Sequence, residues 1–227
     1  MPERMCIGEN TGASMFIRLF AGVPFSYFDG IPLISFGQWL LPVGIFLLAV
    51  GIYAERDEKT DMLSMYRYGS VSCWWKKRFG KRMAFSVRTA VFLQLIVISC
   101  DIAAGNISAF SAELLAKISI LWLLHSASMA ALSALLELFP VRRFAPGALF
   151  LLEGVTFIIG CRARVVSHAM YGMWGMCLQS SLCEAGGFPA GAIIAVEAAL
   201  AAAAFFIGHQ YIKRGKFYYH REMADGV

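Results

Sequence analysis

Residues 55–83 read ERDEKTDMLSMYRYGSVSCWWKKRFGKRM and form the longest polar interval of the chain. This interval carries eight Lys and Arg residues against four acidic residues, and long apolar runs lie on both sides of it. Lys and Arg concentrate in the cytoplasmic loops of membrane proteins. The interval is therefore predicted to be a cytoplasmic loop that lies along a membrane and meets a partner there.

The composition of the 227 residues supports this prediction. Hydrophobic residues make up 59% of the chain, charged residues only 15%, and the mean hydropathy is +0.63. Soluble domains carry about a quarter charged residues, so the chain is expected to be an integral membrane protein. The net charge of +5 does not indicate nucleic-acid binding, because the basic residues lie in short intervals between apolar runs.

Apolar runs predict an all-α, polytopic bundle of five clear transmembrane helices. The predicted spans cover residues 31–54, 84–104, 114–138, 145–161 and 188–212. Residues 1–30 lack a long apolar run and are expected to form an N-terminal interfacial, re-entrant or partial span. The transmembrane domain is thus assigned to residues 31–216, and residues 217–227 are assigned to a cytoplasmic tail.

The distribution of Lys and Arg predicts the orientation. The 55–83 interval, the 139–145 turn and the C-terminal tail are basic, whereas the 105–113 turn has no Lys or Arg and the 162–187 interval has only two. The basic segments are expected in the cytoplasm and the other two outside. Five spans would then begin outside, so a first helix is expected to be missing or reduced to residues 12–30.

Two short helices are predicted within the 55–83 loop. Thr60 is a candidate cap for a helix that begins at Asp61 and ends at Gly69. The second helix would carry three hydrophobic residues on one face, namely Val71, Trp75 and Phe79.

The second helix is amphipathic. Trp74 and Trp75 suit the headgroup layer of a membrane. Five basic residues suit anionic lipid: Lys76, Lys77, Arg78, Lys81 and Arg82. Two interpretations stay open, an interfacial helix that only sets the topology and a surface that docks a partner.

Three ionisable residues lie near the middles of predicted spans: His125, Glu153 and Glu197. A charge at this depth costs a few kcal/mol, so these side chains are expected to face the bundle interior, in partnership or protonated. They predict either an intramembrane polar path, with a proton-sensitive joint as a variant, or a structural cluster that includes serines such as Ser126 and Ser128.

The cysteines do not form a CxxC pair, so no metal site is predicted. The 162–187 interval is apolar enough to fold back into the outer leaflet as short helices. Within it, Cys177 and Cys183 are candidates for an external disulfide, with Cys161 as a competitor and free buried thiols as the alternative.

The chain lacks the GxxxxGK[ST], HExxH and GxSxG motifs, so it is not expected to be an enzyme or to bind ATP itself.

Three strings carry a resemblance to a known family: GIYAERD at 51–57, YRYGS at 66–70 and WWKK at 74–77. Together with the order of spans over most of residues 31–216, they resemble the permease subunits of bacteriocin-associated ABC transporters, which belong to the type-2 ABC permeases. That family has six spans and begins inside. The resemblance implies a second permease, identical or paralogous, and a separate ATPase subunit that binds ATP and Mg; this chain itself needs no cofactor.

The resemblance also implies that the 61–82 segment acts as a coupling helix. The expected ATPase contacts are Met65, Tyr66, Arg67, Tyr68, Trp74 and Trp75. The expected function is ATP-driven export of a peptide or another amphipathic compound across the plasma membrane. The alternatives are a non-transporting immunity or scaffold protein and a proton-coupled carrier that uses His125, Glu153 and Glu197.

Overall fold

Four helices in the described part of the chain are long and apolar enough to cross a membrane. They are α2 (Leu33–Arg67), α3 (Val71–Ala103), α4 (Ala112–Leu136) and α8 (Ala190–Lys213). The computed structural model describes residues 14–23, 33–68, 70–106, 111–139, 144–161, 164–184 and 186–214, and these residues form helices and connections without a strand. The chain is therefore an all-helical protein with four candidate membrane helices.

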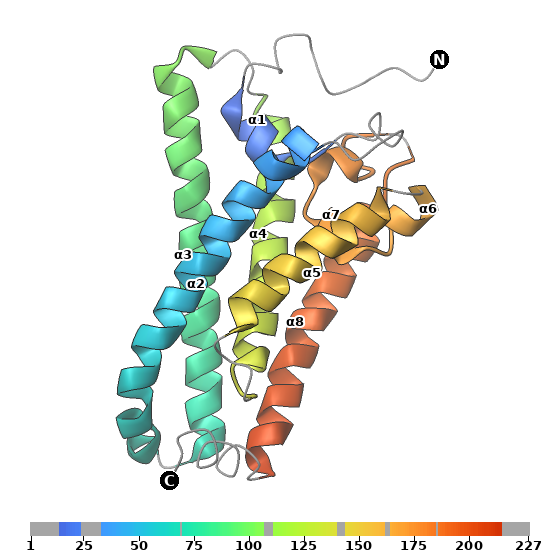
Figure 1. Cartoon of the computed structure of the whole chain (residues 1–227). Helices are drawn as coiled ribbons and strands as arrows, with labels where there is room; N and C mark the ends of the chain where they lie inside the picture. Colours follow the sequence, from blue (N-terminus) through green and yellow to red (C-terminus); the bar gives the residue numbers. More distant parts are fainter. Residues whose placement is uncertain are drawn as a thin grey trace.

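The fifth predicted span is a shorter helix, α5 (Ala145–Gly160), of 16 residues. A helix needs about 20 residues to cross a hydrocarbon core of about 30 Å. The prediction of five spanning helices is therefore not confirmed, although α4, α5 and α8 begin and end within two residues of the spans predicted for them. Figure 1 shows α5 lying obliquely beside the long helices.

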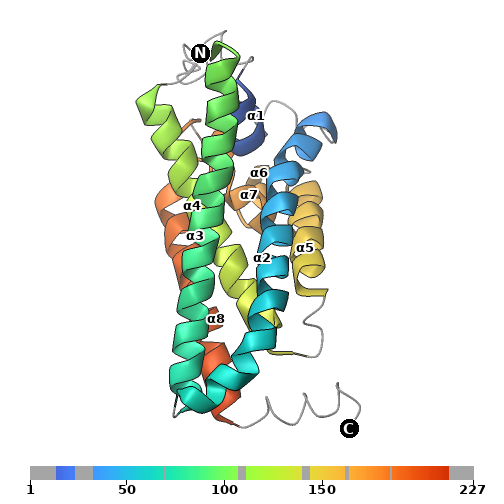
Figure 2. The ribbon, with the colours of Figure 1, turned by 90° about the vertical axis from the view of Figure 1, so that its left-hand side faces the viewer.

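Helix α4 lies at the centre of the bundle and packs against α3 and α8 along its length (Figure 2). Its buried side chains include Ile118, Leu121, Trp122 and Met129. The surrounding helices expose large apolar side chains on their outer faces, among them Leu48 of α2, Phe92 of α3, Leu151 of α5 and Phe206 of α8. An apolar outer surface of this extent matches a lipid environment.

Helices α2 and α3 form one long hairpin. Helix α2 continues to Arg67, so the prediction of a separate short helix from Asp61 with Thr60 as its cap is wrong. Residues 55–67 contain no Gly or Pro and are rich in strong helix formers, so nothing interrupts the helix there. Helix α3 begins at Val71, with the Ser70 hydroxyl accepting a hydrogen bond from the Cys73 amide at 3.2 Å. Gly69 lies outside the described residues.

The first turns of α3 pack into the bundle. Trp74 and Trp75 are 2% and 0% exposed, so they do not lie at a lipid headgroup surface. The Trp75 indole donates a hydrogen bond to the Phe205 carbonyl of α8 at 3.0 Å. Gly208 of α8 faces the same indole, where a Cβ atom would collide with the ring. The face predicted from Val71, Trp75 and Phe79 therefore turns inward, toward α4 and α8.

The basic residues of α3 fall into two groups. Arg78 and Arg82 are buried and bind the Glu137 carboxylate at 3.2 and 2.9 Å. These two arginines are therefore not exposed to anionic lipid, contrary to the prediction. The other three basic residues of the group are exposed: Lys76, Lys77 and Lys81.

Helix α1 (Met15–Phe20) is buried at the end of the bundle where α2 begins (Figure 1). The Asp101 carboxylate of α3 accepts hydrogen bonds from the Ser14 hydroxyl and from the amides of Met15 and Phe16, at 2.8 to 2.9 Å. An anion at a helix N-terminus is favoured by the unpaired amides and the helix dipole. The described part of residues 1–30 is therefore a short helix inside the bundle, held by α3.

The described part of the 162–187 interval contains three short helices, as predicted, and its position in the outer leaflet stays a prediction. They are α6 (Arg164–Ser167), α7 (Tyr171–Trp174) and the 3₁₀ helix η5 (Cys177–Gln179). The Leu178 amide donates to the Ala21 carbonyl at 2.9 Å, and the Gln179 side chain donates to the Val23 carbonyl at 2.7 Å. The segment after α1 and the segment after α7 thus bind each other.

Candidate functional site

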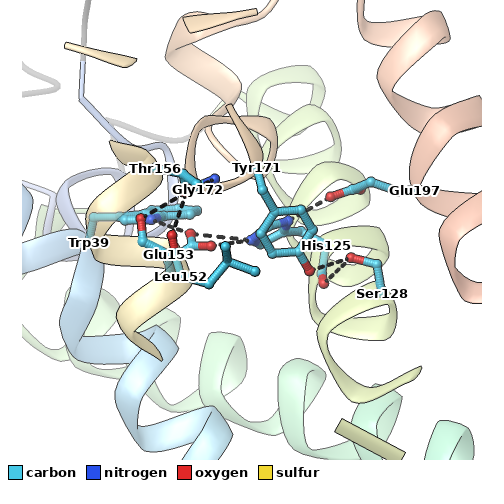
Figure 3. Close-up of polar contacts among 9 residues, drawn as sticks. All are labelled: Trp39, His125, Ser128, Leu152, Glu153, Thr156, Tyr171, Gly172 and Glu197. Carbon is cyan, nitrogen blue, oxygen red and sulfur yellow. Dashed lines mark hydrogen bonds and ion pairs between the residues drawn. The ribbon is translucent and has the colours of Figure 1, made fainter. Parts of the chain in front are cut away.

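The imidazole of His125, in the middle of α4, reaches a carboxylate with each of its nitrogens. Nδ1 lies 2.6 Å from Glu197 Oε1 on α8, and Nε2 lies 3.2 Å from both oxygens of Glu153 on α5. All three side chains are 0% exposed. Figure 3 shows His125 between the two carboxylates, and we call these three residues the His125 cluster.

Helix α2 contributes a further donor. The Trp39 indole donates a hydrogen bond to Glu153 Oε1 at 3.0 Å (Figure 3). Glu153 thus faces donors from two helices, whereas Glu197 has one hydrogen-bond partner among the described residues. Glu197 Oε2 is buried and has no hydrogen-bond partner among the described residues. The two carboxylates are therefore not equivalent.

The phenol ring of Tyr171 on α7 packs against the imidazole of His125, with ring centroids 4.8 Å apart. Its hydroxyl lies 2.9 Å from the Ser128 hydroxyl, which also donates to the His125 carbonyl at 2.9 Å. Because Ser128 has a single proton, the Tyr171 hydroxyl donates to Ser128 in this arrangement. The phenol therefore packs on the His125 cluster and hydrogen-bonds beside it.

Two glycines allow α7 to approach the cluster closely. A Cβ atom on Gly175 would lie 2.8 Å from His125 Cδ2, and one on Gly172 would overlap the Glu153 carbonyl oxygen. The Gly172 amide donates to Thr156 Oγ1 at 2.8 Å, which ties α7 to α5. Larger residues at either position would push α7 away and open the cluster.

The three ionisable side chains of the cluster form a row of hydrogen bonds, from carboxylate to imidazole to carboxylate. Each imidazole nitrogen faces a different carboxylate, so the three side chains do not converge on one point. The described residues contain no group of three or more His, Cys, Asp or Glu that could hold a metal ion. Imidazole and carboxylates in hydrogen-bond contact can exchange protons.

The structure brings together the three ionisable residues that the sequence singled out, from three helices that are distant in sequence. Ser128 joins their surroundings through the His125 carbonyl, not through the ring. The Ser126 carbonyl accepts a hydrogen bond from the Ser86 hydroxyl of α3 at 3.2 Å, and the Ser126 hydroxyl has no partner among the described residues. The role of the cluster as a polar path stays a prediction.

Sequence reasoning missed Trp39 and Tyr171 as members of the site. Both combine a large apolar ring with one polar atom, so they do not interrupt an apolar run in a hydropathy profile. Their hydrogen-bonding needs could have indicated them. A buried indole or phenol needs a hydrogen-bond partner, and so do the ionisable groups predicted at membrane depth.

Of the residues predicted to contact an ATPase, Trp74 and Trp75 are buried against α4 and α8. Tyr68 is half-buried, with the Lys77 ammonium 4.3 Å above its ring. The side chains of Met65, Tyr66 and Arg67 lie outside the described part of the structure. The docking role stays a prediction that now depends on residues 65–68 at the end of α2, which we call the hairpin tip.

Cys177 and Cys183 are brought together by the turn after η5. Their Sγ atoms lie 2.8 Å apart as thiols. The hydrogen bond from Cys177 and burial raise the pKa of the Cys183 thiol. This proximity fits the candidate disulfide, and the predicted competitor Cys161 is buried at the end of α5.

Comparisons with family models, with curated proteins and with solved structures found no match for this chain.

Proposed function

We propose that the chain is a permease subunit of an ATP-driven ABC transporter in the plasma membrane, with the ATPase on a separate chain and a second permease beside it. The observation that carries the proposal is the long α2–α3 hairpin. The apolar part of α2 covers Leu33–Arg56, but the helix continues to Arg67. Eleven further residues at 1.5 Å each extend it by about 16 Å, far enough to leave the hydrocarbon core and reach a partner.

The contacts of the hairpin with the bundle support a coupling role. Trp75 binds the α8 backbone, and Arg82 binds both the Glu137 carboxylate after α4 and the Val50 carbonyl of α2. The Trp75 and Arg82 side chains are buried, so a force on the hairpin tip would move α4 and α8 together with α3. Helices α4 and α8 carry His125 and Glu197, so the same movement would reach the centre of the bundle.

Charge supports a cytoplasmic position for the hairpin tip. Three exposed lysines lie in the first turns of α3: Lys76, Lys77 and Lys81. These turns lie at the same end of the bundle as the C-terminal end of α8 (Figure 1). Lys and Arg at one end of a helical bundle favour the cytoplasmic side. The cargo is proposed to be a peptide or another amphipathic compound, moved outward.

Co-purification with candidate ATPases, followed by ATP turnover measurements, tests the proposal. The double variant Tyr66→Ala, Arg67→Glu is expected to lose the ATPase from the complex while the permease stays folded. Glu113→Gln is the matched control, because Glu113 is exposed at the other end of the bundle. Equal assembly and equal ATP turnover in the double variant would rule out docking at the hairpin tip.

A second candidate function is a proton-coupled carrier, and the His125 cluster is the observation that favours it. Ionisable residues at membrane depth are typical of proton relays in transporters. A carrier predicts transport that continues without ATP, requires a proton gradient and is lost in Glu153→Gln. Transport that stops when ATP is removed, with the gradient maintained, would favour the ABC permease instead.

A further inference from the structure

We propose that the His125 cluster is a proton-binding site in which His125 is an imidazolium, Glu153 is its ionised partner and Glu197 carries an exchangeable proton (Figure 3). This inference stands on the geometry of the cluster and holds for either proposed function. It identifies the ligand as a proton and the Glu197 carboxyl as the group that binds it.

The number of protons follows from charge balance. With both glutamates ionised and the imidazole neutral, the cluster would have a charge of −2, and further protons are counted from this state. Two protons make it neutral, and a single proton leaves one negative charge. All three side chains are fully buried among apolar helices, where an unbalanced charge costs a few kcal/mol. The neutral cluster with two protons is therefore the favoured state.

The first proton belongs on His125. Both imidazole nitrogens face carboxylate oxygens. A neutral imidazole has one N–H and would direct a lone pair at one carboxylate, whereas an imidazolium donates from both nitrogens. The imidazolium also supplies the positive charge that a buried carboxylate requires.

Glu153 is the better anion of the two glutamates. Trp39 Nε1 can only donate, and it faces Glu153 Oε1 at 3.0 Å. His125 Nε2 reaches both oxygens of the same carboxylate. Hydrogen bonds to the charged form of a carboxylate favour that form.

The second proton then falls to Glu197. Only Glu197 Oε1 is engaged, by His125 Nδ1, and Oε2 is buried without a partner among the described residues. An ionised carboxylate with a buried, unpartnered oxygen loses the hydrogen bonds that it makes with water. Protonation removes that charge and leaves Oε1 as an acceptor for the imidazolium.

No other charged side chain in the described residues takes part in the cluster. Helix α7 presents Tyr171, whose hydroxyl is paired with Ser128, and helix α2 presents the Trp39 indole. The buried charges of α3 are engaged elsewhere: Arg78 and Arg82 bind Glu137, and Asp101 binds the start of α1. Glu197 is thus the group whose proton controls the net charge at the centre of the bundle.

The first test is infrared spectroscopy of the purified full-length protein at neutral pH. The wild type is expected to show the carbonyl stretching band of a protonated carboxylic acid, and Glu197→Gln is expected to lose it. Glu113→Gln, with an exposed and paired carboxylate, should retain the band. Absence of the band in the wild type, or its persistence in Glu197→Gln, would overturn the assignment.

The second test is thermal unfolding in detergent as a function of pH. Between the ordinary values of Glu, about 4.3, and His, about 6.5, an unfolded glutamate has lost its proton while His125 is protonated in both states. The native protein then binds one proton more than the unfolded chain, so its stability falls as the pH rises. The fall in melting temperature over this window is expected in the wild type and is expected to be smaller in Glu197→Gln.

Comparison of two isosteric variants separates the two glutamates. Glu197→Gln mimics the protonated residue and should keep the wild-type melting temperature at pH 6, whereas Glu153→Gln removes the anion and should lower it. The opposite order would move the proton to Glu153 and overturn the proposal.

Melting temperatures that rise with NaCl but not with choline chloride would identify a bound cation in place of the proton and would also overturn it.

Discussion

Glu137, the residue after α4, binds two buried arginines of α3. Arg78 lies 3.2 Å and Arg82 lies 2.9 Å from the same carboxylate oxygen, and the guanidinium of Arg82 also lies 5.0 Å from the ring centroid of Tyr53 on α2. Two cations around one anion are stable only while the anion is charged. This carboxylate therefore joins α3 to the end of α4 through electrostatic contacts that water does not screen, and Arg82 extends these contacts to α2.

Replacement of Glu137 by Gln should weaken the bundle strongly. Removing one partner of a buried ion pair costs about 3–5 kcal/mol, because the other charge stays buried without compensation. Two arginines share Glu137, so the loss is expected at the upper end of this range. Chemical or thermal unfolding in detergent measures it.

Glu113→Gln is the matched control, because it removes an equivalent charge from the exposed Glu113–Lys117 pair on α4. Little change in unfolding is expected there, since exposed ion pairs contribute little. Equal effects of the two substitutions would show that Glu137 does not hold the arginines.

Trp39→Phe should destabilise the protein by more than the loss of ring area. The variant keeps an aromatic ring but leaves Glu153 Oε1 without the indole donor, which costs about 1–3 kcal/mol for a buried polar atom. Trp122→Phe is a close control: Trp122 is equally buried and touches Trp39, but its indole nitrogen has no hydrogen-bond partner among the described residues. The difference between the two melting temperatures isolates the hydrogen bond, and the absence of a difference would contradict it.

At the scale of secondary-structure elements, the apolar runs predicted the helices well and the polar intervals poorly. Helices α4, α5 and α8 lie where the sequence placed them, because a long apolar run has few other structures available in a membrane. The 55–83 interval was predicted as a loop with two short helices, yet the helices continue through it, because its charged residues are also good helix formers. The polar interval marks the end of the apolar part of α2 at Arg56, not the end of the helix.

Helix α1 depends on one acidic residue of another helix. Six residues are too few for a stable helix in isolation, so the Asp101 carboxylate and the burial of α1 must hold it. Asp101→Ala is expected to release α1 and to increase hydrogen exchange at the amides of Met15 and Phe16 by at least tenfold, which corresponds to about 1.4 kcal/mol.

Ser99→Ala on the same helix provides the comparison for Asp101→Ala, because the Ser99 hydroxyl is exposed and donates to the Leu95 carbonyl of its own helix. Exchange in α1 should not change in that variant. Unchanged exchange in Asp101→Ala would mean that apolar packing alone holds α1.

At the scale of the whole molecule, the sequence predicted which groups lie deep in the bundle but not which of them touch. His125, Glu153 and Glu197 follow from the cost of charge in an apolar run, since each lies near the middle of its helix with apolar residues on both sides. Their mutual distances depend on how three helices rotate and cross, and these angles come from side-chain packing that a single sequence does not display. The inward turn of Arg78 and Arg82 was missed for the same reason, because Glu137 becomes their partner only after α3 and α4 pack together.

The orientation of the bundle can be tested with two introduced cysteines in a background without the native ones. Lys76→Cys lies at the hairpin end and Glu113→Cys lies at the opposite end, and both positions are exposed. A membrane-impermeant thiol reagent is expected to label the position-113 variant in intact cells and the position-76 variant only after the cells are opened. The reverse pattern would contradict the orientation predicted from Lys and Arg.

The hydrogen bonds between the segment after α1 and the segment at Leu178 also set an order of events during synthesis. Val23 leaves the ribosome 155 residues before Leu178, which at ordinary translation rates is roughly 8 to 30 s. Over that interval the carbonyls of Ala21 and Val23 have neither of the donors that they bind in the finished protein. Helix α1 is thus synthesised first but completed late, and the newly made chain must protect this segment until its last partners arrive.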